Sequence, residues 1–241
     1  MDIYSNTNQG LRRMSNQDNF KNNKISENTL WSVVCDGMGG VNGGNIASLI
    51  AVQTAEKILN QKFKKKLSEN QMHDLCVEIV ENANKQIYQK SLRQLDLRGM
   101  GTTMIVILID EQKAYITHVG DSRVYLKRND EVRQVTMDHS YVQDLLNRGE
   151  ITEEEAKHHP HRNIITRSVG VYKAVECDIT ILELEKGDII VSCTDGLSNY
   201  LSNETLNEML KDYDEKIADK LVDFALECGG IDNVTATVIN V

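Results

Sequence analysis

The 241-residue sequence predicts an α+β fold, in which strands and helices occur in separate groups along the chain. Two observations support this class. Apolar residues recur at three- and four-residue steps over two long stretches of the first half, which is the period of amphipathic helices. After Gly101 the pattern changes to short β-rich runs with tight turns between them. Because the two kinds of element do not alternate regularly, antiparallel sheet layered with helix fits this order better than a parallel sheet.

The first half of the chain should contain strands and then helices. We expect strands at residues 3–8 and 30–35, and helices at residues 47–58 and 72–87. A polar turn containing Asn16-Gln17-Asp18 connects the two expected strands. A loop rich in glycine, with Gly39 among its four glycines, should connect the second strand to the first helix.

The second half should be mainly β, with one polar interruption. The expected strands are at 103–109, 114–119, 123–127, 177–181, 188–193 and 235–241, and a helix is expected at about 215–227. The strands at 103–127 are typical of an antiparallel meander with Gly120-Asp121-Ser122 as one of its turns. The interruption, an excursion at about 138–170, is polar and predicts short helices at 141–148 and 152–157.

Composition and charge exclude several classes of function. Lys and Arg number 27 against 36 for Asp and Glu, a net charge of −9, whereas a general nucleic-acid binder needs the opposite sign. The longest apolar run, residues 104–109, is about a third of the roughly 20 residues that span a bilayer, so no membrane insertion is expected. The N-terminus resembles no secretion signal and the cysteines contain no C-x-x-C pair, which favours a cytoplasmic protein. The length fits a single domain, 1–241, and we expect a monomer.

Aspartates follow two of the apolar runs. Asp36 comes after the run at 30–35 and Asp195 after the run at 188–193, and each is followed by glycine. An Asp-Gly pair between apolar runs is also a common hairpin turn, but no return strand follows either pair. Asp121, in contrast, lies between two expected strands, where a hairpin turn explains it without a function.

Two further aspartates complete a candidate metal site. Asp18 lies in the polar turn between the first two strands, and Asp232 directly precedes the last one. If these carboxylates meet at one sheet edge, their mutual repulsion calls for cations. The candidate ligands are oxygen atoms, which favours Mg²⁺ or Mn²⁺ over Zn²⁺. The histidines at 158–161 are an alternative site for a softer metal, although a polar loop also explains them.

Six motifs extend over nearly the whole chain. They are residues 10–18, Asp36-Gly37-Met38-Gly39-Gly40, Gly101-Thr102-Thr103, Val119-Gly120-Asp121-Ser122-Arg123, Asp195-Gly196 and Asp232-Asn233-Val234-Thr235. Their order and spacing resemble the metal-dependent Ser/Thr protein phosphatases of type 2C. The excursion at about 138–170 resembles the flap of the compact bacterial members, which are often paired with a membrane-bound Ser/Thr kinase. The resemblance implies a central sandwich of two antiparallel β-sheets flanked by α-helices on both sides, and hydrolysis of phosphoserine and phosphothreonine in proteins.

The resemblance also implies a role for individual residues. The family's metal-binding positions correspond to Asp18, Asp36, Gly37, Asp121, Asp195 and Asp232, and its catalytic positions to Arg13 and Asp36. By resemblance, Asp36 bridges two Mn²⁺ or Mg²⁺ ions with help from the Gly37 carbonyl, and a hydroxide between the ions attacks phosphorus. Asp195 and Asp232 complete the shell of one ion, and Asp18 holds the other mainly through water. Asp121 would hold a third, weaker ion together with Asp195, and Arg13 would bind the phosphate.

The chain departs from the family pattern at several positions. Met38 stands where animal relatives have a histidine, and because methionine cannot donate a proton, the acid that protonates the leaving alcohol is unassigned. Gln17 replaces a common glutamate beside Asp18, which weakens the expected water shell of the second ion. Asn8 and Asn45 also stand where acidic residues are common.

Two alternatives compete with this function. A cysteine-dependent phosphatase needs a C-x₅-R loop, and no arginine stands six residues after any of the five cysteines, so that class is excluded. A catalytically silent regulatory protein of the same fold would usually lose a metal aspartate or the phosphate arginine. This chain keeps them all, and inertness toward phosphopeptides across a Mn²⁺ titration would be needed to favour the silent protein.

Overall fold

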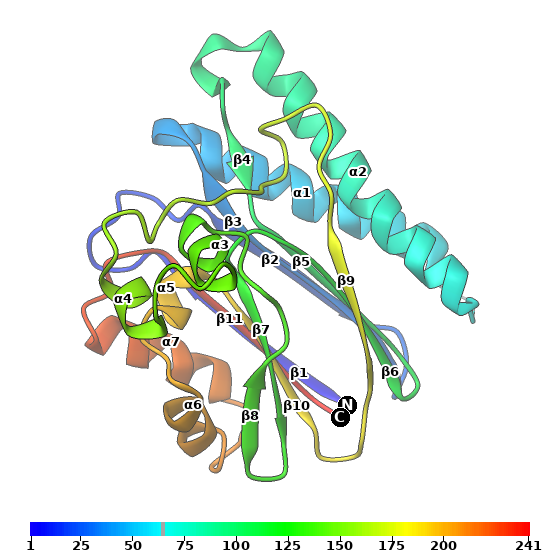
Figure 1. The fold of residues 1–241 in the computed structure, drawn as a ribbon. Helices are drawn as coiled ribbons and strands as arrows, with labels where there is room; N and C mark the ends of the chain where they lie inside the picture. The colour runs from blue at the N-terminus through cyan, green and yellow to red at the C-terminus, as the bar shows by residue number, and fades with distance from the viewer. Residues whose placement is uncertain (64–65) are drawn as a thin grey trace.

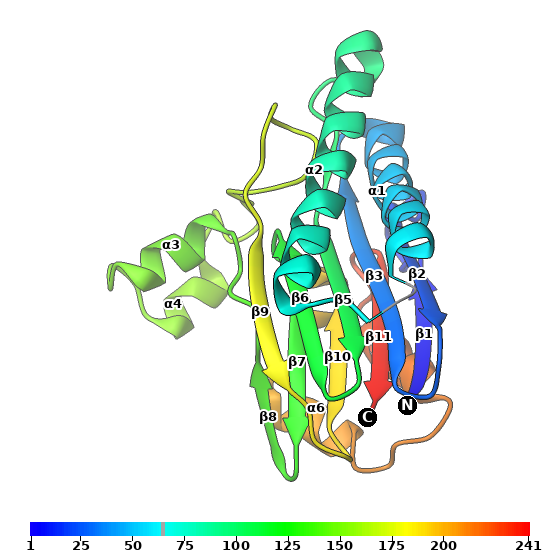
Figure 2. The same cartoon turned by 90° about the vertical axis from the view of Figure 1, so that its right-hand side faces the viewer.

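A computed structural model describes residues 1–63 and 66–241 of the chain. Two antiparallel β-sheets lie face to face, and helices cover the outer face of each sheet (Figure 1). Figure 2 shows the resulting layers from the side, with α1 and α2 on one face. This architecture confirms the fold class that the sequence predicts.

The first sheet lies under the two long helices. Its strand order is β2-β3-β5-β6-β9, with β4 paired to β3. The strands are β2 (Asp18–Lys24), β3 (Thr29–Met38), β4 (Gly101–Thr102), β5 (Met104–Asp110), β6 (Lys113–Val119) and β9 (Asp178–Glu183). The helices are α1 (Gly40–Lys62) and α2 (Glu69–Arg93), and α2 is followed by the 3₁₀ helix η1 (Leu95–Leu97). A capping box at Ser68 and Gln71 begins α2.

The second sheet contains both ends of the chain. Its strand order is β1-β11-β10-β7-β8. The strands are β1 (Asp2–Asn8), β7 (Arg123–Arg128), β8 (Glu131–Gln134), β10 (Ile189–Cys193) and β11 (Val234–Asn240). Three helices cover its outer face: α5 (Asp195–Ser198), α6 (Asn203–Met209) and α7 (Ile217–Glu227). Among the residues that the structure describes, no helix is both long and apolar enough to cross a membrane.

The central strands are buried on both faces, which explains their unbroken apolar sequences. In β5, Met104, Val106 and Leu108 pack toward α1 and α2. The alternate residues Ile105, Ile107 and Ile109 pack between the two sheets. Because successive side chains of a strand point to opposite faces, a strand between two apolar layers needs apolar residues at every position.

The flap projects from the sandwich as two short helices, as Figure 2 shows. They are α3 (Tyr141–Asn147), capped by Ser140, and α4 (Glu153–His158), which begins with a capping box at Thr152 and Glu155. Both helices were predicted within about one residue of their bounds. The histidines at 159 and 161 pack against the ring of Tyr141, with ring centroids 5.9 Å apart in both pairs.

Two predictions about the strands are wrong. The strands β6 and β7 do not form a hairpin, because β6 pairs with β5 and β9, whereas β7 pairs with β8 and β10 of the other sheet. The Gly120-Asp121-Ser122 segment therefore crosses from one sheet to the other. Asp18 was predicted to lie in a polar turn. It is instead the first residue of β2, a strand that the sequence did not predict.

The strand β3 is longer than predicted, and the glycine-rich loop is much shorter. The strand continues through Asp36 and Gly37 to Met38, and α1 begins at Gly40, so most of the expected loop is helix. Glycine permits this abrupt change of direction. A Cβ atom on Gly37 would lie 2.1 Å from the carbonyl oxygen of Gly44, so the strand and the first turns of the helix are in backbone contact.

Candidate active site

The candidate site is built where the two sheets meet at the same end of the sandwich. Asp18 and Asp36 are directly opposite each other on β2 and β3. In the other sheet, Asp195 begins α5 one residue after β10, and Asp232 precedes β11. Asp121 lies on the segment that crosses between the sheets. The structure therefore brings together all five aspartates that the sequence predicts, and each carboxylate influences the titration of at least one other.

Asp18 is held by threonines from the opposite sheet. The hydroxyl groups of Thr194 and Thr235 donate hydrogen bonds to its Oδ2 atom, at 2.9 and 2.7 Å. Its Oδ1 atom is buried and accepts no hydrogen bond. Burial raises the pKa of Asp18 to about 7, although the two hydroxyl groups act in the opposite direction.

The backbone of Asp36 is fixed by the neighbouring threonines. The Thr103 hydroxyl accepts a hydrogen bond from the Asp36 amide at 2.9 Å, and the Thr102 hydroxyl donates to the Asp36 carbonyl at 2.8 Å. The Thr103 hydroxyl also contacts that of Ser122 at 2.8 Å. Both threonines belong to the Gly101-Thr102-Thr103 motif, whose purpose the sequence left open. They attach Asp36 to the segment that carries Asp121.

Burial and neighbouring negative charges make it unfavourable for several carboxyl groups of this cluster to ionise. Burial raises the pKa of Asp36 well above its usual value, and the charges of Asp18 and Asp195 raise it further. Burial also raises the pKa of Asp195, followed by the charge of Asp232, and raises that of Asp121 to about 8. Near neutral pH the cluster therefore cannot hold its full negative charge unless positive charge is supplied.

Arg13 supplies part of that positive charge. Its Nη2 atom lies 2.6 Å from Asp232 Oδ2. This hydrogen bond, together with the charges of Asp232, Asp195 and Asp36, raises the pKa of the guanidinium group. More than half of the Arg13 side chain is exposed, so the guanidinium group stands at the open edge of the site. The sequence predicted that Arg13 belongs to the site, but not that it pairs with Asp232.

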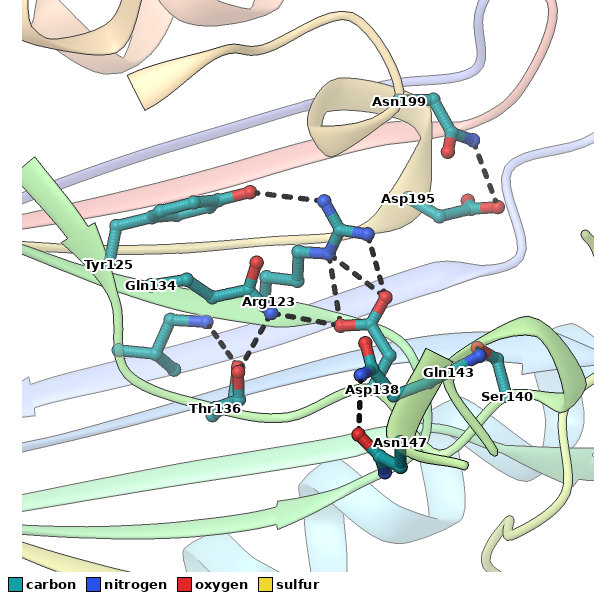
Figure 3. Close-up of polar contacts among 11 residues, drawn as sticks. Arg123, Tyr125, Gln134, Thr136, Asp138, Ser140, Gln143, Asn147, Asp195 and Asn199 are labelled. Atoms are coloured by element: carbon teal, nitrogen blue, oxygen red, sulfur yellow. Dashed lines mark hydrogen bonds and ion pairs between the residues drawn. The ribbon is translucent and has the colours of Figure 1, made fainter. Parts of the chain in front are cut away.

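A hydrogen-bond network around Asp138, at the base of the flap, supports the Asp121 segment. Arg123 donates to both carboxylate oxygens of Asp138, with its closest contact, from Nη2 to Oδ2, at 2.7 Å (Figure 3). Gln134 donates a further hydrogen bond to Asp138 at 3.0 Å. Figure 3 shows this network beside the α5 turn that carries Asp195. Arg123 belongs to a motif found in the sequence, but the motif indicated no role for it. Nothing in the sequence pattern pointed to Asp138.

His139 holds the other side of the same segment. The backbone amide of Gly120 donates to His139 Nδ1 at 3.0 Å, and the backbone amide of His139 donates to the Gly120 carbonyl at 2.8 Å. The ring of His139 stacks on the buried ring of His118, with centroids 4.7 Å apart. Asp121 is thus fixed from both sides by the base of the flap.

The donor set of the site fits hard divalent cations. Within residues 1–63 and 66–241, no three Asp, Glu, His or Cys side chains already surround a single point as metal ligands. However, Oδ1 of Asp18 and Oδ1 of Asp195 are both buried without a hydrogen-bond partner. An unpartnered buried carboxylate oxygen is costly, and a cation is the partner that would satisfy it. Because the available ligands are oxygen atoms, the residues suit Mg²⁺ or Mn²⁺ better than a soft metal.

Comparisons with known proteins agree with the fold and the site. Residues 9–226 match the family model for protein phosphatase 2C. The serine/threonine phosphatase Stp of Listeria monocytogenes is 35% identical over 239 residues, which cover 97% of this chain and 93% of the relative. The S. agalactiae serine/threonine phosphatase has a TM-score of 0.91 at 34% identity and is matched over 100% of this chain and 99% of that chain. The catalytic domain of the phosphatase PstP in complex with two manganese ions has a TM-score of 0.87 at 31% identity, over 99% and 97% of the two chains.

A two-sheet sandwich with acidic residues clustered at one end is the architecture of a metal-dependent phosphatase. The chain belongs to the protein phosphatase 2C family. The resemblance found in the sequence is thereby confirmed, and the chain is an enzyme of the protein phosphatase class. Relatives that are themselves named phosphatases do not favour the catalytically silent alternative.

Proposed function

We propose that this chain hydrolyses phosphoserine and phosphothreonine in proteins and uses Mn²⁺ or Mg²⁺ to do so. The names of the relatives support the substrate class. The observation that carries the metal dependence is the pair of buried, unpartnered oxygens on Asp18 and Asp195, two carboxylates whose pKa values are raised by burial. We further propose that residues 1–241 act as one catalytic domain, with the flap as part of it.

The proposed ligands divide between two ions and a weaker third one. Asp36 would hold both of the main ions with help from the Gly37 carbonyl. Asp195 and Asp232 would help to hold one of them, and Asp18 would help to hold the other, mainly through water. Asp121 would hold the third ion with Asp195. When bound, such ions neutralise charge on the phosphoryl oxygens and activate water at cellular pH.

The role proposed for Asp232 concerns its salt bridge with Arg13. Its Oδ2 atom contacts Arg13 at 2.6 Å, whereas its Oδ1 atom accepts the Asn233 amide at 2.8 Å. We propose that a cation at Asp232 displaces Arg13 from Oδ2, because both would occupy the outer side of the same carboxylate. The guanidinium group released in this way has two parallel N–H donors, which suit two oxygens of a phosphoryl group.

The protonation state of the carboxylates should be linked to the binding of the ions. Burial and mutual repulsion favour protonated carboxyl groups in the cluster, and bound cations reverse this preference. Binding of the ions is thus expected to release protons, and ion affinity should increase with pH. The threonines on Asp18 keep one of its oxygens oriented, so that only Oδ1 is free to accept a new partner.

A phosphopeptide panel tests the proposed function directly. Peptides of one sequence that carry phosphoserine, phosphothreonine or phosphotyrosine would be assayed with Mn²⁺, with Mg²⁺ and with a chelator. We expect phosphate release from the first two peptides that requires a divalent ion. Hydrolysis that persists in chelator, or inertness across the whole Mn²⁺ titration, would contradict the proposal. A Ser/Thr kinase as one substrate, a monomeric state and a cytoplasmic location stay predictions.

A further inference from the structure

We propose that three apolar side chains beside Arg13 bind an apolar residue next to the phosphorylated serine or threonine of the substrate. These are the side chains of Leu11, Met14 and Ile231, which we call the apolar rim. The inference rests on the proposed function and deepens it, because it assigns a sequence preference to the same site.

The apolar rim borders the Arg13–Asp232 salt bridge from both chain segments. Met14 follows Arg13 in the sequence and Ile231 precedes Asp232, and the salt bridge joins the two segments at 2.6 Å. The Leu11 amide donates to the Gly230 carbonyl at 2.7 Å, which brings the third side chain to the same place. Figure 1 shows the two segments, the loop after β1 and the loop before β11, at the same end of the sandwich.

The three side chains are unusually open to water. Their exposed fractions are 65% for Leu11, 94% for Met14 and 62% for Ile231. Single exposed apolar residues are common on protein surfaces, but several together around a site that binds a ligand indicate an interaction surface. Here they belong to the two segments that the salt bridge of Arg13, the arginine proposed to bind phosphate, joins.

The loop that carries Met14 is held in place by hydrogen bonds. Gln9 donates to the Arg13 carbonyl at 2.7 Å, and the side-chain amide of Asn233 donates to the carbonyls of Gln9 and Ser15 at 2.8 and 2.9 Å. On the other segment, Gly230 has a φ of +52°, and a Cβ atom there would lie 2.9 Å from Leu11 Cγ. The backbone that carries the apolar rim is therefore held in place, and the segments need little ordering when a ligand binds.

Geometry and charge indicate which substrate residue the apolar rim binds. Consecutive Cα atoms are about 3.8 Å apart, so Met14 is one residue step from Arg13, just as the neighbour of a phosphoserine is one step from its phosphate-bearing residue. An acidic neighbour would meet the net charge of −9 and the site's own carboxylates, whereas an apolar neighbour would cover the rim. We therefore infer that the preferred substrate has a large apolar residue, such as leucine or methionine, directly adjacent to the phosphorylated residue.

The experiment compares three phosphopeptides that differ only at that adjacent position, which holds leucine, serine or glutamate. Values of kcat/KM are measured with Mn²⁺ and divided by kcat/KM for an aryl phosphate, which has no neighbouring residue. For the unaltered protein we expect the leucine peptide to exceed the serine peptide by about fivefold to tenfold, and the glutamate peptide to be the poorest.

Two variants and a matched control locate the preference. Met14→Ser and Ile231→Ser should each reduce the leucine-over-serine ratio by about threefold, mainly through KM. Ile25→Ser is the control, because Ile25 is 41% exposed and follows the far end of β2. It should leave the ratio unchanged.

Three outcomes would overturn the inference. The first is equal rates on the leucine and serine peptides, the second is an unchanged ratio in both rim variants, and the third is an equal change in Ile25→Ser. If the aryl phosphate is hydrolysed with Mn²⁺ in these cases, the proposed function stands and only the sequence preference fails. If the unaltered protein hydrolyses neither the aryl phosphate nor any peptide, both fail.

Discussion

Asp18 and Asp36 are paired residues on adjacent antiparallel strands, so two carboxylates point from neighbouring positions at the end of one sheet. Like charges that face each other across a strand pair are destabilising. Hydroxyl groups from the opposite sheet satisfy one oxygen of Asp18 and leave the other without a partner. An arrangement that costs stability in the unliganded protein is explained if a cation binds there.

Asp36→Asn tests the centre of the proposed metal site. Asparagine keeps the shape of aspartate but lacks the charge that would hold two cations. Because bound cations contribute several kcal/mol to transition-state stabilisation, we expect Mn²⁺-dependent hydrolysis of an aryl phosphate to fall by about 100-fold or more. The far-ultraviolet circular dichroism should be unchanged. Asp110→Asn, at the remote end of β5, is the control and should retain full turnover. Near-normal turnover of Asp36→Asn would remove Asp36 from the mechanism.

The raised pKa of Asp18 predicts how stability depends on pH without metal. The folded pKa is about 7 and the reference value is 3.8, so between these values the folded chain binds more protons than the unfolded chain. The free energy of unfolding in chelator should therefore fall as pH rises from about 4 to about 7. One pKa unit corresponds to about 1.4 kcal/mol, so a loss of several kcal/mol is expected from Asp18 and the carboxylates around it.

Urea unfolding in chelator at pH 5 and at pH 8 measures the larger part of this loss, because the titration is incomplete at pH 5. Asp18→Asn does not titrate in this range, so it should show a flatter pH dependence and unfold at higher urea than the unaltered protein at pH 8. Mn²⁺ should restore stability to the unaltered protein at pH 8, because it binds only the folded state. Identical pH slopes for the two proteins would show that Asp18 is not the group responsible.

The sequence predicted the strands that carry Asp36 and Asp195 because long apolar runs directly precede both residues. It missed β2, because that strand lies at the edge of its sheet and is mostly polar, with Phe20 as its only large apolar residue. The pairing of Asp18 with Asp36 was therefore beyond sequence reasoning, although Asp18 itself was predicted to belong to the site.

The location of Asp121 illustrates a different limit. Periodicity identifies β6 and β7 as strands but does not indicate whether they belong to the same sheet. A short turn between two strands usually forms a hairpin, and here it crosses between sheets. The contacts that fix this crossing, from Arg123 to Asp138 and from Gly120 to His139, join residues 15 to 19 positions apart, and no local pattern indicates them.

Arg13→Lys tests the proposed recognition of phosphate. Lysine retains the positive charge but cannot present two parallel donors to two phosphoryl oxygens. We expect kcat/KM for a phosphopeptide to fall by about tenfold to 100-fold, with Arg13→Ala lower still, while the melting temperature changes little because Arg13 is largely exposed. Arg12→Lys, at the exposed neighbouring position, is the control. If the two lysine variants behave alike, Arg13 has no special role in binding phosphate.

The strand β7 offers a matched pair of ion pairs, one at each end. At its start, Arg123 binds both oxygens of Asp138 beside the Asp121 segment. At its end, Arg128 binds both oxygens of Asp188, with contacts of 2.9 and 2.6 Å. Both aspartates are buried, so Asp138→Asn and Asp188→Asn should each lower the free energy of unfolding, although Arg128 keeps a second carboxylate partner in Glu185 at 2.7 Å.

The two variants should differ in catalysis, and this difference tests whether the flap base positions Asp121. Asp138→Asn releases the segment that carries Asp121, so a higher Mn²⁺ concentration should be needed for half-maximal hydrolysis of an aryl phosphate. Asp188→Asn also removes the charge of a buried aspartate but lies at the other end of β7, so its Mn²⁺ dependence should match that of the unaltered protein. Isothermal calorimetry with Mn²⁺ measures the same difference without turnover. Equal Mn²⁺ responses in the two variants would mean that the Arg123–Asp138 pair serves stability alone.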